Sequence, residues 1–119
     1  MAERITSPTY LKLVRTLPCY LCGMRPPACQ RIEAQHSTAN RGKSLKQGDG
    51  ESWPACLHCH YVVYHNMGIR ERRELDERAV VATREAIAAR FPRHTLPPRD
   101  ELEKPTLAPF ASTRIRAGA

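Results

Sequence analysis

The chain has 119 residues, with 19 Lys and Arg against 12 Asp and Glu and a formal net charge of +7. This length suits one small domain, and no apolar stretch approaches the roughly 20 residues that span a bilayer, so we expect no membrane segment. The N-terminus also lacks the features of a secretory signal, which favours a cytoplasmic protein. The positive charge suits a polyanionic partner such as nucleic acid.

The first predicted element is a short helix that begins at Pro8. Ser7 is a suitable N-cap, proline is tolerated in the first turn, and Pro18 stops the helix. Four apolar side chains then share one face, which we expect to pack over a metal-bearing core: Tyr10, Leu13, Val14 and Leu17.

Two short strands are predicted on either side of a basic loop. Residues 31–36 alternate in polarity, as a strand does, and a second strand could include Ser52 and Trp53 and end at Pro54. The loop at 37–50 is polar and glycine-bearing. Its basic residues are candidate phosphate contacts, with a solvated loop as the alternative: Arg41, Lys43 and Lys46.

Two further helices are predicted before the tail. Residues 57–67 can form a helix that ends at Gly68. After a charged link, Asp76 can cap a second helix over 77–91. Pro92 stops that helix, so we divide the chain into a domain at 1–91 and a Pro-rich basic tail at 92–119 that is extended or disordered.

The four cysteines of two CxxC motifs carry the strongest prediction. Residues 23–55, 33 positions, separate Cys19-x-x-Cys22 from Cys56-x-x-Cys59, and Cys29 is left over. Two CxxC turns can supply the tetrahedral sulfur shell of a structural zinc. A disulfide pair or a thiol redox site is the alternative, but a redox site needs only one CxxC motif.

Histidines cluster around the second CxxC motif. His60 directly follows Cys59, and His36 ends the first predicted strand. If strand and helix lie side by side, the two imidazoles can face one cleft suited to metal-assisted phosphodiester cleavage. His65 follows His60 by five residues, about 140° around an ideal helix, and is a ligand only if the helix bends or ends early at Gly68.

Three segments in this order resemble the zinc-bearing HNH nucleases, especially small phage and prophage members. They are Leu17-Pro18-Cys19-x-x-Cys22-Gly23, Glu33-Ala34-Gln35-His36 and Trp53-Pro54-Ala55-Cys56-x-x-Cys59-His60. The resemblance implies a small α+β fold with a zinc-stabilised ββα-metal core, flanking helices and an extended C-terminal tail. It also implies a bacterial or phage-infected cell as the location.

By this resemblance the chain would be a DNA endonuclease. His36 matches the general base and His60 matches a ligand of a second divalent cation: magnesium, manganese, nickel or zinc. Gln35 stands where such families usually have an Asp or His ligand. The middle asparagine of the pattern has no clear match, and Asp49 or Glu51 stands near its place as a carboxylate that could orient the base or bind the cation.

Three hypotheses remain open at this stage. The chain could be an HNH-type endonuclease, or a zinc-stabilised nucleic-acid-binding module in which Gln35 has abolished cleavage. It could also be a zinc-stapled adaptor for a protein partner, using the helix from Glu77 onward. His36 and His60 favour the enzyme, whereas Gln35 favours the binding module.

Overall fold

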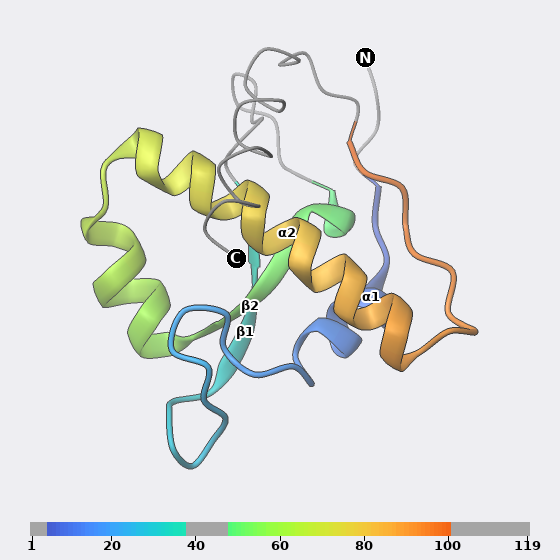
Figure 1. The fold of residues 1–119 in the computed structure, drawn as a ribbon, viewed down its shortest axis with the longest axis horizontal. Helices are drawn as coiled ribbons and strands as arrows, with labels where there is room; N and C mark the ends of the chain where they lie inside the picture. Colours follow the sequence, from blue (N-terminus) through green and yellow to red (C-terminus); the bar gives the residue numbers. More distant parts are fainter. Residues whose placement is uncertain (1–4, 38–47, 101–119) are drawn as a thin grey trace.

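The computed structural model describes residues 5–37 and 48–100, and these form a small α+β fold, as predicted (Figure 1). A two-stranded antiparallel sheet lies beneath a long diagonal helix, with a short helix near the end of that helix. No helix in the described ranges is long and apolar enough to cross a membrane. The elements in chain order are α1 (Pro8–Val14), β1 (Ile32–His36), η1 (Asp49–Glu51), β2 (Ser52–Cys56), η2 (Cys59–Val63), η3 (Tyr64–Asn66) and α2 (Ile69–Arg90).

The strand β2 continues through Pro54, whereas the sequence predicted that it would end there. Pro54 lies opposite Ala34 in the antiparallel register. The flanking bonds from Ser37 N–H to Glu51 O and from Leu57 N–H to Arg31 O place the hydrogen-bonded pairs at odd-numbered residues of both strands. The Pro54 nitrogen therefore points away from β1, so the missing donor costs the ladder nothing.

The two faces of the sheet carry different side chains. Strand alternation puts Glu33 and Gln35 on the same face as Trp53, and puts His36 on the opposite face. Trp53 is fully buried and packs against residues of η3 and α2. The cysteine cluster packs instead around Ile32, on the face of His36. Leu21 packs against both the cysteine cluster and the core under α2, so the two clusters adjoin.

Helix α1 begins as predicted but packs elsewhere. The Ser7 hydroxyl oxygen accepts a hydrogen bond from Tyr10 N–H at 3.3 Å, which caps the helix. The buried face of Tyr10, Val14 and Leu17 contacts Ile87 of α2. The expectation that this face would cover the metal-bearing core is therefore wrong.

The helical run after β2 covers residues 57–66, close to the predicted helix at 57–67, but it is not a regular α-helix. Its middle, η2, has π-helical geometry: Tyr64 N–H donates to Cys59 O, five residues earlier. The run then tightens into the 3₁₀ turn η3. This geometry changes which side chains share a face.

Helix α2 starts seven residues before the predicted cap at Asp76. Gly68 is the N-cap, and its N–H donates to the Glu71 carboxylate at 3.1 Å. Residues 69–76 contain three Arg, two Glu and one Leu, which favour helix over the predicted link. Asp76 is buried inside the helix, where it accepts hydrogen bonds from Trp53 Nε1 at 2.8 Å and Tyr64 OH at 2.7 Å.

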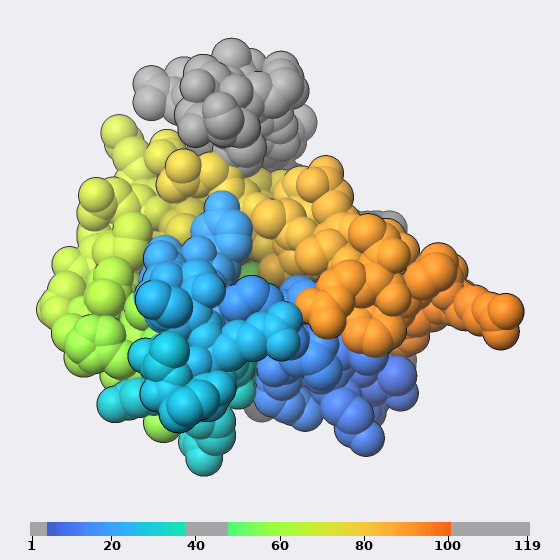
Figure 2. Space-filling model, turned by 60° about the horizontal axis from the view of Figure 1, so that its bottom comes forward, coloured from blue at the N-terminus to red at the C-terminus, as the bar shows by residue number. Residues whose placement is uncertain are grey.

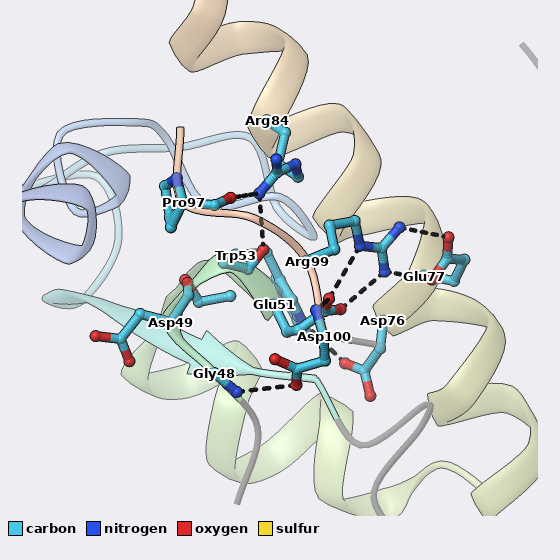
Figure 3. A network of polar contacts seen from close by, with 12 residues as sticks. Gly48, Asp49, Glu51, Trp53, Asp76, Glu77, Arg84, Pro97, Arg99 and Asp100 are labelled. Carbon is cyan, nitrogen blue, oxygen red and sulfur yellow. Dashed lines mark hydrogen bonds and ion pairs between the residues drawn. The ribbon is translucent and has the colours of Figure 1, made fainter. Parts of the chain in front are cut away.

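Residues 92–100 have no helix or strand, but they pack on the domain rather than forming a separate tail (Figure 3). Arg99 donates to both oxygens of the buried Glu51 and to the Glu77 carboxylate of α2. Arg84 donates to Pro97 O at 2.7 Å. The remaining tail, 101–119, lies outside the described residues.

Candidate metal centre

The four predicted cysteines converge on one point and form a group that could hold a structural metal such as zinc. Their sulfur atoms all lie within 4.8 Å of one another. Zinc–sulfur bonds of roughly 2.3 Å in a tetrahedron give sulfur–sulfur edges of about 3.8 Å, so a small contraction would close the shell. The members are Cys19, Cys22, Cys56 and Cys59.

Backbone hydrogen bonds build the two turns and join them. Gly23 N–H donates to Cys19 O at 2.8 Å, and Gly23 has a φ of 73°, the left-handed conformation that glycine adopts readily. Tyr20 N–H donates to Pro54 O at 2.9 Å, which ties the first turn to β2. In Figure 2 the segment around residues 18–30 lies between the helical run and the end of α2.

The thiols of the cluster differ in acidity. Burial opposes ionisation of Cys56, but hydrogen bonds from the Cys59 backbone N–H and from neighbouring thiols lower the pKa of Cys56 to about 7. Burial and the neighbouring sulfurs of Cys56 and Cys19 raise the pKa of Cys59. A bound divalent ion would stabilise the thiolate form of all four cysteines.

Cys29 lies beside this group but is not one of the four. Partial burial and the nearby sulfurs of Cys56 and Cys22 raise the pKa of Cys29 to about 12, so it stays protonated. Its thiol donates to Gln30 O at 3.2 Å. The sequence predicted that Cys29 lies outside the set of four metal-binding cysteines, and the observed cluster does not include it.

His36 pairs with a buried carboxylate. Its Nε2 lies 3.0 Å from Oδ1 of Asp49, and the exposed fractions of the two side chains are 30% and 4%. The other Asp49 oxygen accepts from Ser7 N–H at 2.7 Å. Asp49 therefore contacts His36, the predicted base. This contact fits the first of its two predicted roles, which were to orient the base or to bind the cation.

The Glu51 carboxylate, unlike that of Asp49, contacts residues 99 and 100 rather than a histidine. Its carboxylate accepts from Arg99 and from Asp100 N–H, and it is 1% exposed. The Glu77 carboxylate, helped by Glu51 and opposed by burial, raises the pKa of Arg99. No described contact brings Glu51 to a histidine, so its carboxylate is a poor candidate ligand for a catalytic cation.

His60 lies beside Glu33, a residue that the sequence analysis did not single out as a ligand. His60 Nδ1 is 3.5 Å from Glu33 Oε1. Because Glu33 lies on the opposite face of β1 from His36, the two predicted histidines approach the sheet from different sides. The alternation of side chains along β1 could have pointed to Glu33, because it places Glu33 on the same face as Gln35.

His65 lies next to His60, although an α-helix would separate them. Their ring centroids are 5.4 Å apart with planes 14° apart. In the π-helical η2, hydrogen bonds join residues five apart, so residues at this spacing stack on one face. The π-helical geometry therefore places His65 on the same face as His60.

Gln35 and His58 lie within the described residues, whereas the basic residues of the predicted loop do not. Gln35 Nε2 donates to the adjacent His36 O at 2.9 Å. His58 is exposed, as expected. The candidate phosphate contacts Arg41, Lys43 and Lys46 lie outside the described residues.

Comparison of the chain with known proteins finds no matching family model, no matching curated protein and no matching solved structure.

Proposed function

We propose that this chain is a metal-dependent endonuclease of the HNH type that hydrolyses DNA phosphodiester bonds. His36 is the general base and His60 is a ligand of the catalytic cation. The observation that carries the proposal is the 3.0 Å contact between His36 Nε2 and the buried Asp49 carboxylate, at the end of β1. The net charge of +7 suits a DNA substrate.

The contact with Asp49 gives His36 the form that a base needs. A carboxylate accepting from Nε2–H fixes the tautomer whose lone pair is on Nδ1, and it stabilises the imidazolium that forms when the base takes a proton. In this role Nδ1 removes a proton from the water that attacks the phosphorus. The 30% exposure of His36 allows substrate to approach.

The sheet limits where a phosphate can bind. The side chains of His36 and His60 approach opposite faces, and β1 is an edge strand of a two-stranded sheet. A phosphate would therefore meet both imidazoles along the outer edge of β1. When bound, a divalent cation supplies positive charge for the phosphorane and the leaving 3′ oxygen.

A non-catalytic nucleic-acid-binding module is the second candidate, and Gln35 favours it. An amide is a weaker ligand for a hard cation than a carboxylate, and the Gln35 amide nitrogen donates to its neighbour's backbone. As a binding module, the chain would bind DNA but would not cleave it.

A plasmid-nicking assay tests the proposal. The zinc-loaded full chain is incubated with supercoiled DNA and Mg²⁺, Mn²⁺ or Ni²⁺, and nicked product is measured over time. We expect cleavage by the wild-type chain and a loss of about 100-fold or more in His36→Ala, because a positioned base contributes that much. His58→Ala, which removes an exposed histidine inside the second CxxC motif, should keep the activity.

The outcomes separate the two candidates. DNA binding that weakens with salt, without nicking under any of the three cations, would establish the binding module instead. Nicking that survives His36→Ala would remove His36 as the base. Circular dichroism and zinc content of each variant show whether a loss of cleavage comes from unfolding.

A further inference from the structure

We propose that a hollow between the first CxxC turn and α2 binds an acidic segment of a partner protein, with one large apolar side chain of that segment seated in the hollow. Neither His36 nor His60 lines this space. The proposal therefore goes beyond the nuclease and can be tested without any cleavage.

The hollow has a mostly apolar lining, a volume of about 270 Å³ and an opening to solvent. It lies between the blue N-terminal segment and the gold-to-orange helix α2 (Figure 2). Cys19 and Tyr20 line one wall, Ala82 and Ala86 of α2 line the other, and the buried Pro54 lies at the floor. Small-molecule sites have roughly 300–1,000 Å³, so this space suits a single side chain better than a cofactor.

Backbone hydrogen bonds hold one wall of the hollow in place. Tyr20 N–H donates to Pro54 O at 2.9 Å, and Cys19 N–H donates to Met24 O at 2.9 Å. Cys19 is also one of the four cysteines that could hold a metal. Binding a partner therefore needs little ordering of this wall, which favours affinity.

The residues that leave this space open are two alanines of α2. Ala82 and Ala86 are four positions apart, so they share one face of the helix. Beside the hollow, Tyr20 is 38% exposed and Met24 is 50% exposed. Large apolar side chains that gather at a hollow in the surface are typical of a protein-binding site.

The charge around the hollow complements an acidic partner. Residues 5–30 supply the first wall and contain three Lys and Arg but no Asp or Glu. All three are exposed: Lys12, Arg15 and Arg25. On α2 the exposed carboxylate of Glu85 lies about 100° around the helix from Ala86. A segment with acidic residues on both sides of its apolar side chain therefore matches this surface in charge.

An apolar side chain fits this hollow better than a nucleobase does. The ring edges of a base carry hydrogen-bond donors and acceptors, which would lose water here without gaining partners in a mostly apolar lining. A phenylalanine side chain has no such groups. The lining thus favours a protein segment over an extruded base, although both bring negative charge.

An NMR titration of the zinc-loaded, ¹⁵N-labelled full chain tests the surface. The probe is a synthetic peptide with one central phenylalanine between two runs of glutamate. We expect the largest shifts at the amides of Cys19, Tyr20, Ala82 and Ala86. A peptide with a central alanine should bind about tenfold or more weakly, because it buries no aromatic side chain. A peptide with lysine in place of glutamate should not bind.

Two pairs of variants locate the binding. Ala82→Leu fills the hollow and should weaken peptide binding by about tenfold or more, whereas Ala88→Leu, exposed and about 160° around α2 from Ala86, should bind as the wild type does. Arg15→Glu should weaken binding, and the loss should shrink as salt is raised. Arg73→Glu changes an exposed arginine near the start of α2 and should have no effect.

The results that overturn the proposal are specific. They are shifts confined to another face, equal affinity of the phenylalanine and alanine peptides, or wild-type binding by a folded Ala82→Leu variant. The two peptides decide the point even if Ala82→Leu is unstable, since they change no residue of the chain. Loss of peptide binding in Ala82→Leu with plasmid nicking unchanged, or absent in both proteins, supports the surface and leaves the nuclease to its own test.

Other occupants of the hollow give different results, and each of them refutes an acidic partner. Self-association in sedimentation experiments that Ala82→Leu abolishes would assign the hollow to a second copy of the chain. Shifts at the same amides with a single-stranded oligonucleotide, but not with the peptide, would assign it to nucleic acid. Tighter peptide binding by Phe110→Ala would assign it to the chain's own C-terminal segment.

Discussion

Asp76 is a residue whose role depends entirely on its partners. It is fully buried in α2, where its two oxygens accept from Trp53 Nε1 on β2 and Tyr64 OH on η3. One carboxylate thereby connects three elements in the core beneath the long helix. Burial of a charged group is tolerated where hydrogen bonds satisfy it.

We expect Asp76→Ala to lower the free energy of unfolding by about 2–6 kcal/mol. The change leaves two buried donors without an acceptor, each costing about 1–3 kcal/mol. Urea denaturation followed by Trp53 fluorescence measures the effect, and Glu85→Ala, an exposed change in α2, should stay within about 0.5 kcal/mol of the wild type. Equal stability of the two variants would contradict a structural role for Asp76.

At the scale of elements, residues 97–100 act as a strap across η1 and α2 (Figure 3). The approach is close: a Cβ on Gly50 would lie 2.7 Å from Pro98 O, so a side chain there would clash with backbone. The Arg99 guanidinium lies between the carboxylates of Glu51 and Glu77. Because η1 also carries Asp49, the strap supports the carboxylate that contacts His36.

We expect Arg99→Leu to destabilise the fold by about 3 kcal/mol, because it leaves the Glu51 carboxylate buried without its partner. Arg93→Leu changes an exposed arginine of the same segment and should have little effect. Thermal unfolding of both variants measures the difference. Full stability of Arg99→Leu would mean that the strap does not hold η1 in solution.

For the whole molecule, the cysteine group joins two turns that are far apart in the chain. Residues 23–55 separate the two turns, and the buried residues of the described chain form three small clusters around a sheet of only two strands. A chain with so small a core commonly needs a metal or a disulfide to be stable. None of the five cysteines forms a disulfide.

Removal of the metal should therefore unfold the domain. Elemental analysis of reduced protein should give one zinc per chain, and a strong chelator should abolish the cooperative thermal transition, since structural zinc contributes on the order of 10 kcal/mol in small domains. Cys19→Ser should lose the zinc, whereas Cys29→Ser should keep it. A stable zinc-free fold, or zinc loss in Cys29→Ser alone, would contradict the assignment of the four ligands.

The sequence by itself determined the local features of this protein. The CxxC spacing predicted which four cysteines meet, Ser7 and Pro8 predicted the start of α1, and alternation predicted β1. These features depend on residues close together in the chain, where capping, proline geometry and side-chain periodicity act directly.

Tertiary structure decided the rest, because those features depend on partners distant in sequence. The register turned the Pro54 nitrogen outward, so β2 could continue to Cys56. Burial against Trp53 and Tyr64 placed Asp76 inside a helix, although aspartate is common at helix caps. The site changed for the same reason: the sheet brings Glu33 to His60, a contact between residues far apart in the chain.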